Sequence, residues 1–250
     1  MKKSLWSSRA GRLQVRRVPR IRSRIHFSHS VYFSVSGRAW KGSTEICLQS
    51  LSIFSSMAIP SILDAAHAFA ARGLGPGGVA IDATVGNGHD TLFLVQEVGE
   101  EGTVIGFDVQ SDALQATRDR VESEAPDVSG CLHLVHAGHE SMAEHVGAGV
   151  QVDTVMFNLG YLPGGDHSVI TTPDTTLPAL REAVDLLGVG GVVTIVAYPG
   201  HDGGAAETDA VASWVSSLPQ ATFRSLSYRF VNQANDPPRL FVVEKRSKPR

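Results

Sequence analysis

The sequence is poor in cysteine and has no long apolar run. Its 250 residues hold only two cysteines, Cys47 and Cys131, which excludes a disulfide framework and a cysteine-built zinc site and favours a reducing compartment. No window approaches about 18 consecutive apolar residues, so a membrane-spanning helix is excluded. With 42% hydrophobic and 19% charged residues, the composition is instead typical of one globular domain with a sizeable core.

Acidic residues are absent from the first 44 positions. This stretch holds eleven of the 22 lysines and arginines, so the chain from Glu45 onward has eleven cations against 25 acids, a net charge of −14. We separate a basic leader, residues 1–56, which we expect to be disordered, from a domain at residues 57–250. Three origins of the leader stay open: a mitochondrial or plastid transit peptide, an arm that binds nucleic acid, or an upstream extension of a cytoplasmic protein that starts at Met57.

From Ser61 onward, short apolar runs alternate with amphipathic stretches, which is typical of βα units around a mainly parallel sheet. Ser61 is placed to cap a first helix that runs past Ala70. The apolar runs predict seven strands, at residues 79–83, 103–108, 132–136, 154–158, 192–198, 223–231 and 240–245. Further helices are expected at residues 91–98, 112–124, 173–187 and 207–218. The last two strands follow each other without a helix and predict an antiparallel edge.

A glycine-containing loop, Asp82 to Thr91 (DATVGNGHDT), stands between a predicted strand and a predicted helix, the setting of a nucleotide-binding turn. Gly86 and Gly88 allow a sharp turn and close approach to a ligand. Asp108, 20 residues beyond Gly88, is placed to accept hydrogen bonds from two ribose hydroxyls, which disfavours the alternative of a plain tight turn. A dinucleotide-binding loop needs a third glycine where this chain has Thr91. The loop therefore predicts an adenosine-type ligand.

A second loop follows the fourth predicted strand and reads NLGYLPGGDH from Asn158 to His167. Its first four residues are similar to the Asn-Pro-Pro-Tyr loop of amino-group methyltransferases. In that chemistry the asparagine carbonyl accepts hydrogen bonds from a neutral amine and the tyrosine, here Tyr161, positions the substrate, so most of the gain is proximity. A turn cap and a core edge are the alternative roles of these residues. Asp166 and His167 are either a general base or plain loop residues.

The two loops closely resemble those of one family, S-adenosylmethionine-dependent methyltransferases of 5-aminomethyl-2-thiouridine at the tRNA wobble position, long grouped as rRNA methylases. The resemblance covers about Ile59 to Arg246. It extends over the shorter motifs Gly106 to Gln110 (GFDVQ), Thr171-Thr172, Thr175-Thr176, Gly200-His201, Asn232-Gln233 and Asn235-Asp236-Pro237-Pro238. It implies an α/β, Rossmann-like class I methyltransferase fold, S-adenosyl-L-methionine as cofactor, and the anticodon arm of tRNA as partner, with no membrane association. A homodimer stays open.

Carried over position by position, the resemblance implies three sets of site residues. The catalytic set is Asn158, Tyr161 and Asp166. The cofactor set is Asp82, Thr84, Gly86, Asn87, Gly88, Asp90, Thr91, Asp108, Gln110, His136 and His139. The substrate set is Gly160, Leu162, His167, His201, Asn232, Gln233 and Asn235. The chain departs from its relatives at Ala137, near which they place an acid against the adenine amino group, so backbone groups or Gln110 are expected to bind the adenine.

Three further features bear on partners and rivals. No histidine pair has the spacing of a metal-binding helix, so we assign no metal. Seven of the eleven cations after residue 44 lie between Arg224 and Arg250 and predict a basic C-terminal edge for RNA, with plain surface decoration as the alternative. The rival functions are methylation of rRNA or of a small amine, an NAD-dependent oxidoreductase, and an RNA-binding module without catalysis.

Overall fold

The structure is a computed structural model that describes residues 59–162, 164 and 169–247. The basic leader, residues 1–56, and two predicted site residues, Asp166 and His167, lie outside the described residues. In chain order the elements are α2 (Ile62–Gly73), β1 (Val79–Asp82), α3 (His89–Val98), β2 (Thr103–Asp108), α4 (Ser111–Glu124), η1 (Pro126–Cys131), β3 (Leu132–His136), η2 (His139–Ser141), α5 (Met142–His145), β4 (Val152–Asn158), α6 (Pro173–Leu186), β5 (Leu187–Ala197), α7 (Gly204–Ser217), β6 (Phe223–Tyr228) and β7 (Arg239–Lys245).

The strands form one seven-stranded sheet of order β3-β2-β1-β4-β5-β7-β6. β3, β2, β1, β4 and β5 run parallel, whereas β7 is antiparallel to both of its neighbours. The mainly parallel sheet with an antiparallel C-terminal edge is thereby confirmed. The winding direction reverses between β1 and β4, and open α/β sheets bind ligands at the carboxyl ends of the strands at such a switch point.

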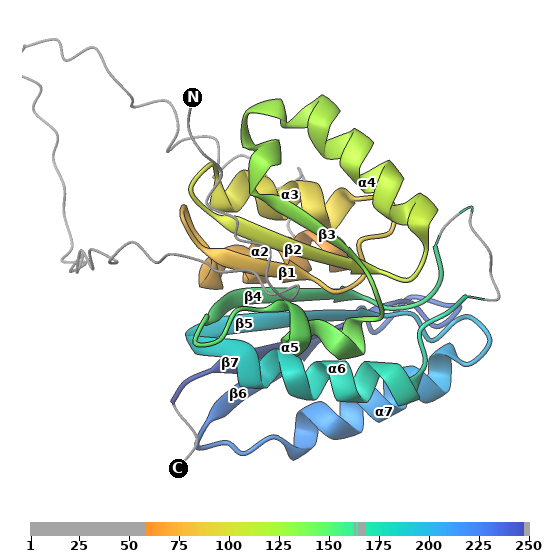
Figure 1. Cartoon of the computed structure of the whole chain (residues 1–250). Coiled ribbons are helices and arrows are strands. Elements are labelled where there is room, and N and C mark those ends of the chain that lie inside the picture. The colour runs from red at the N-terminus through yellow and green to blue at the C-terminus, as the bar shows by residue number, and fades with distance from the viewer. Residues whose placement is uncertain (1–58, 163, 165–168, 248–250) are drawn as a thin grey trace, which may run out of the picture.

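Helices cover both faces of the sheet (Figure 1). α2, α3 and α4 pack on one face through apolar residues such as Ile62, Leu94 and Val121. α5, α6 and α7 pack on the other. Ala80 and Ile81 are neighbours in β1 but belong to different cores, because successive side chains of a strand point to opposite faces.

The first helix begins where its cap predicts, and the sixth strand ends earlier than expected. Oγ of Ser61 accepts a hydrogen bond from the Asp64 amide at 3.1 Å and so caps α2. The expectation of a strand over residues 223–231 is wrong, because β6 ends at Tyr228, opposite Leu240. The segment 235–238 opens with two residues of positive φ, 63° and 45°, and closes with two prolines that lack an N–H. The ladder cannot continue through such a turn, and residues 229–238 form a loop.

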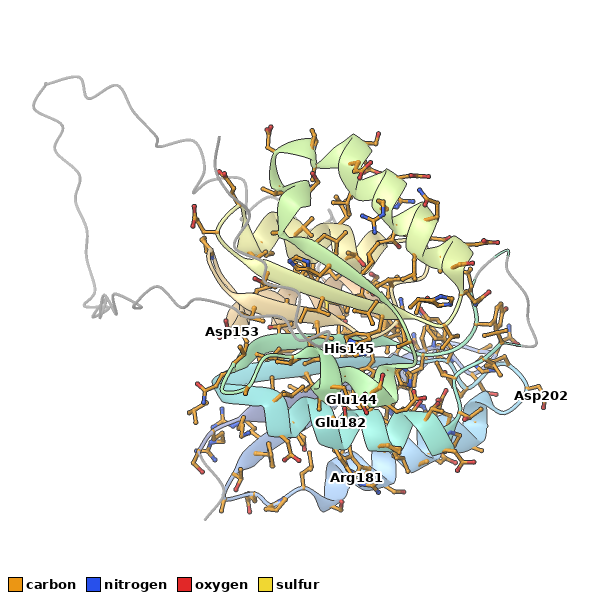
Figure 2. All side chains as sticks on the ribbon, in the orientation of Figure 1. Glu144, His145, Asp153, Arg181, Glu182 and Asp202 are labelled. Atoms are coloured by element: carbon orange, nitrogen blue, oxygen red, sulfur yellow. The ribbon has the colours of Figure 1, made fainter. Side chains whose placement is uncertain are left out.

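The two ends of the sheet differ in character, and Figure 2 shows the labelled Asp153 and Asp202 at these opposite ends. Asp153 lies at the amino end of β4 and accepts a hydrogen bond from the Val79 amide at 3.0 Å, which ties β4 to β1. Asp202 lies in the loop that follows β5, at the end where the predicted site residues gather. Within the described ranges, no helix has the length and apolar character needed to cross a membrane.

Candidate active site

A cavity of about 670 Å³ lies at the carboxyl ends of the parallel strands, within the size range of pockets for small ligands. Both predicted loops contribute to its wall. The predicted cofactor residues that line it are Thr84, Gly86, Asn87, Asp90, Asp108, Gln110 and His139. The predicted catalytic and substrate residues that line it are Asn158, Gly160, Tyr161, Leu162, His201 and Asn235.

Other predicted residues do not reach the cavity wall. They are Asp82, Gly88, Thr91, His136, Asn232 and Gln233. Asp82 and Thr91 are buried in the protein, and Nε2 of His136 instead lies 2.9 Å from the Val109 carbonyl. Asn232 and Gln233 are exposed in the loop that follows β6. The structure therefore gives these residues no direct place in the cavity.

The glycine loop is held against α4. Gly86 and Gly88 have positive φ angles of 49° and 80°, which only glycine adopts without strain. A Cβ atom at Gly88 would lie 2.9 Å from the Thr117 Cα, so the close approach also excludes a larger residue. Oγ1 of Thr117 donates to the Gly86 carbonyl at 3.0 Å, and Nε of Arg120 donates to the Asn87 carbonyl at 2.7 Å. The loop is thus fixed from behind while its other side faces the cavity.

Asp108 joins the glycine loop to the end of β2. Its Oδ2 accepts a hydrogen bond from the Gly86 amide at 3.1 Å, and its Oδ1 accepts one from the Gln110 amide at 2.9 Å. A carboxylate offers about four acceptor positions, so two stay available after these bonds. They suit a pair of vicinal hydroxyl groups in the cavity.

Asp82 is a structural carboxyl group beneath the cavity. It is fully buried, and it accepts hydrogen bonds from the Thr91 hydroxyl at 2.5 Å and from the Thr84 amide at 3.1 Å. Burial and the nearby charge of Asp90 raise the pKa of Asp82 from its ordinary 3.8 to about 7. Thr84 in turn accepts a hydrogen bond from the Asn158 amide at 2.7 Å on its Oγ1. Asp82 therefore supports the junction between the two loops.

Asn158 ends β4 at the switch point and is held at both its backbone and its side chain. Its Nδ2 donates to Oδ2 of Asp90 at 3.3 Å. The Tyr198 hydroxyl also hydrogen-bonds the Asn158 side chain, and burial raises the pKa of that phenol. Both neighbours line the same cavity. Sequence reasoning missed Tyr198, because nothing along the chain links position 198 to position 158.

A buried carboxylate fixes the second loop from the side of α7. Glu207 is 2% exposed and accepts hydrogen bonds from the Thr171 hydroxyl at 2.9 Å and the Thr176 hydroxyl at 2.7 Å. Oγ1 of Thr171 also accepts a hydrogen bond from the Gly160 amide at 2.8 Å. The sequence marks Thr171 and Thr176 only as parts of family motifs, and sequence reasoning missed Glu207. A charged residue on the predicted buried face of a helix was the available signal.

Aromatic rings and the 235–238 turn form the side of the cavity nearest the second loop. The rings of Tyr161 and His201 meet edge to face, with centroids 5.8 Å apart. Tyr161 is 39% exposed, so much of its ring is open to a ligand. Nε2 of His201 is buried and has no hydrogen-bond partner among the described residues. This side offers flat and polar surfaces to a planar substrate.

The segment after β3 supplies a histidine and an acid. Burial lowers the pKa of His139, whose Nδ1 lies 3.2 Å from the Ala83 carbonyl, so at neutral pH its ring is uncharged. Glu140 is exposed and lines the cavity, with its carboxylate lying over Gly138. It stands three positions beyond Ala137, where the sequence lacks the expected acid. Sequence reasoning did not consider this offset.

The basic C-terminal edge is only partly present. Lys245 is buried, and its Nζ donates to the Val184 and Asp185 carbonyls at 2.8 and 3.3 Å, at the C-terminal end of α6. This placement contradicts its assignment to an RNA-binding surface, because the side chain serves the helix end instead. Two arginines of the edge, Arg224 and Arg239, are ion-paired at 3.9 and 3.8 Å.

The cavity fits S-adenosylmethionine through the chemistry of its wall. Asp108 offers free acceptor positions for the ribose hydroxyls, the glycine loop brings backbone close to the ligand, and Val109 adds an apolar surface for a flat base. With its sheet topology, this site defines an S-adenosylmethionine-dependent methyltransferase of class I fold. The chain belongs to the family described as "Putative rRNA methylase", which matches residues 104–244.

Three relatives are similar to this chain in sequence, and two of them are solved structures with a similar fold. The chloroplastic tRNA (mnm(5)s(2)U34)-methyltransferase of Arabidopsis thaliana is 35% identical over 188 residues, 73% of this chain and 69% of that protein. The crystal structure of a "putative rRNA-methylase" from Clostridium thermocellum has 39% identity and a TM-score of 0.72, covering 76% of this chain and 100% of its own. A "putative methyltransferase" from Streptococcus mutans in complex with SAH has 37% identity and a TM-score of 0.68, covering 75% and 99%.

Proposed function

We propose that the protein methylates the aminomethyl nitrogen of 5-aminomethyl-2-thiouridine at the wobble position of tRNA, giving 5-methylaminomethyl-2-thiouridine. The observation that carries the proposal is the place of Asn158, on the wall of one cavity together with Asp108. A side-chain amide at that place suits an amine acceptor, since its carbonyl can accept a hydrogen bond from nitrogen. The name of the chloroplastic relative, which specifies the wobble uridine, supports this acceptor.

In this proposal the chain's residues mainly orient the reactants. When bound, the cofactor supplies a methyl group that a neutral amine can take by a single displacement. The Asn158 carbonyl accepts a hydrogen bond from the amine and thereby directs its lone pair, while Tyr161 and His201 contact the nucleoside base. Holding two reactants in line contributes the larger part of the rate, as in other transfers that need no strong base. We leave Asp166 and His167 as candidates for the proton acceptor.

The proposed cofactor contacts lie at the carboxyl ends of β2 and β3. We assign the ribose hydroxyls to Asp108, whose two remaining acceptor positions match them. We assign the adenine amino group to Glu140, which takes the place of the acid missing at Ala137. Gln110 and the backbone of the glycine loop complete this set.

The RNA would be held by few phosphate contacts. Arg229 is exposed in the loop that follows β6, at the same end of the sheet as the cavity, and is our candidate for such a contact. A core with many more acids than bases disfavours broad phosphate binding, so the nucleoside pocket itself has to supply much of the recognition.

The test uses the full chain with S-adenosylmethionine and tRNA from cells that carry the unmethylated aminomethyl nucleoside, followed by nucleoside mass spectrometry. We expect that nucleoside to gain one methylene in mass. Asn158→Ala should abolish the gain and keep SAH binding, whereas Asp108→Ala should weaken SAH binding by about tenfold or more, the cost of a charge-assisted hydrogen bond. Gln115→Ala, exposed on α4 and off the cavity wall, is the matched control and should change neither.

The rival functions give different results in the same assay. If the protein binds SAH but transfers methyl only to rRNA or to a small amine, it is still a methyltransferase, and the proposed tRNA acceptor is wrong. Binding of NADH in place of SAH would point to an oxidoreductase. An Asn158→Ala variant that behaves as wild type in every measurement would favour an RNA-binding module.

We also propose that residues 1–56 act as an organelle transit peptide, an origin that the sequence left open beside two others. The Arg- and Ser-rich, acid-free composition suits one. The relative named chloroplastic adds support. Fusion of residues 1–56 to a fluorescent protein, with the cations replaced by glutamine as control, tests import directly. A cytoplasmic signal from both fusions would favour a start at Met57.

A further inference from the structure

Behind Asn158, side chains from three elements form a chain of hydrogen bonds. Nδ2 of Asn158 donates to Oδ2 of Asp90 at 3.3 Å, and Oδ1 of Asp90 lies 2.6 Å from Nε2 of His67. Asp90 is in the first turn of α3, His67 is in α2, and Asn158 ends β4. Both oxygens of Asp90 are therefore engaged by the protein itself, although Asp90 lines the cavity.

This arrangement decides which way the Asn158 amide faces. The two ends of a side-chain amide are nearly alike in shape, but one donates and the other accepts. An ionised carboxylate only accepts, so Asp90 selects the rotamer whose NH₂ group faces α3. The carbonyl oxygen is the end of the amide that the bond to Asp90 leaves open, beside the Tyr198 hydroxyl that also hydrogen-bonds this side chain.

His67 is itself held in place. Its ring is stacked on Phe93, with centroids 4.1 Å apart and an angle of 2° between the planes. Phe93 lies one turn beyond Asp90 on α3, so the same helix carries both the carboxylate and the ring that aligns its partner. The His67 and Asp90 side chains are only 24% and 10% exposed, and a hydrogen bond in such a site is less weakened by water than one at the surface. Asp82 and Glu97 are the other acids that influence this group.

We propose that His67 and Asp90 are positioning residues that fix the Asn158 amide with its carbonyl oxygen directed to the acceptor amine. This assignment moves Asp90 out of the cofactor set and brings in His67, which no sequence motif had marked. It rests on the proposed function for the identity of the amine, but the orientation of the amide can be measured without any acceptor.

The first arm of the test is steady-state kinetics of the full chain on the aminomethyl tRNA. Asp90→Asn keeps the size of the side chain but also offers an NH₂ group, so it no longer selects one amide rotamer. His67→Phe keeps a ring to stack on Phe93 and removes the donor. We expect each variant to lower kcat by about 10- to 100-fold, the range expected for a misplaced catalytic group, with KM for both substrates within about twofold of wild type.

Two variants separate positioning from general damage. His67→Gln retains a donor and should recover most of the lost kcat. Glu97→Gln removes a charge that influences His67 but leaves the hydrogen bonds among His67, Asp90 and Asn158 intact. Its kcat should stay within about twofold of wild type, as expected for a substitution that breaks none of these bonds. A rise in KM for S-adenosylmethionine with unchanged kcat in Asp90→Asn would overturn the proposal, since Asp90 would then act on the cofactor.

The second arm observes the amide itself. In ¹⁵N–¹H spectra of the SAH complex, the Asn158 side-chain signal, identified by its loss in Asn158→Ala, should shift in both Asp90→Asn and His67→Phe and return in His67→Gln. A signal that does not respond to either substitution overturns the proposal, whatever the kinetics. If the wild-type enzyme leaves the aminomethyl nucleoside unmethylated, the proposed function fails, and the amide signal still decides whether His67 and Asp90 position Asn158.

Discussion

The carboxylate of Glu207 offers the sharpest test of how the second loop is held. Replacing Glu207 with alanine removes the acceptor of two hydroxyl groups, those of Thr171 and Thr176, at 2.9 and 2.7 Å. Thr176 is fully buried, so its hydroxyl has no water to turn to. A buried polar group left without a partner costs about 1–3 kcal/mol.

Because Thr171 is only half-buried, the two hydroxyl groups together are expected to cost about 2–5 kcal/mol of the free energy of unfolding, somewhat less than twice the full penalty and a large part of the usual 5–15 kcal/mol. For a domain of this size that corresponds to a fall in Tm of roughly 4–20 °C. Denaturant titration of the full chain measures the loss as a lower midpoint with an unchanged m-value.

The decisive comparison is a double variant. Thr176→Val in the Glu207→Ala background removes the stranded hydroxyl and keeps the shape of the side chain, so the double variant should be more stable than Glu207→Ala alone by about 1 kcal/mol. Thr176→Val in the wild-type background should instead be destabilising, because it leaves a buried carboxylate with one donor fewer. If the two substitutions simply add, the hydrogen bond to Thr176 does not stabilise the fold and the reasoning is refuted.

Four further predictions follow from the geometry. The pKa of Asp82 in the folded protein, about 7, lies above its ordinary 3.8, so between these values the folded state binds one more proton than the unfolded state. The free energy of unfolding should therefore fall as the pH rises from about 4 to about 7 and then level off. Asp82→Asn should flatten this curve in ligand-free denaturant titrations. Glu140→Gln should weaken SAH about tenfold in calorimetry by exchanging a charged acceptor for a neutral one, whereas an unchanged affinity would return adenine recognition to Gln110. Lys245→Met should cost about 1–3 kcal/mol of stability in the same denaturant titration through the lost bonds to the end of α6, with KM for tRNA unchanged. Arg229→Gln should instead raise KM for tRNA and lower the salt dependence of tRNA binding by about one charge, with the free energy of unfolding unchanged. If Lys245→Met and Arg229→Gln behave alike, the assignment of Lys245 to stability and of Arg229 to RNA binding is wrong.

The parts of the fold that follow a local rule were predictable from the sequence. The cap at Ser61, the alternation of apolar residues along the strands and the spacing of Gly88 to Asp108 each depend on neighbours within one or two elements. The extent of β6 was predicted wrongly, because apolar residues continue to Val231 whereas the pairing with β7 ends at Tyr228, opposite Leu240. Apolar character along a chain does not reveal where the opposite strand stops.

The supports of the site were not predictable, because their partners are far apart in the sequence. His67 reaches Asp90 across 23 positions, Asp90 reaches Asn158 across 68, and Thr171 reaches Glu207 across 36. A charged residue in an amphipathic pattern is ordinarily read as a surface residue, and Lys245 shows where that reading fails. The residues that face the ligand lie mostly in loops with local motifs, whereas His67 and Glu207, which hold those loops, lie in helices and belong to no motif.

The charge of the described domain limits how it can bind RNA. Of the arginines on the C-terminal edge, Arg224 is ion-paired with Glu244 and Arg239 with Asp209, so part of the apparent positive charge is neutralised locally. These acids are well exposed, so the ion pairs themselves are weak and cost little to break, but the acids stay close to any phosphate that the arginines contact and repel it. Each phosphate contact adds to the salt dependence of binding, and few contacts give a shallow one. Under the proposed function, discrimination among RNAs is therefore expected to come mainly from the cavity, where we place the nucleoside against Asn158 and Tyr161.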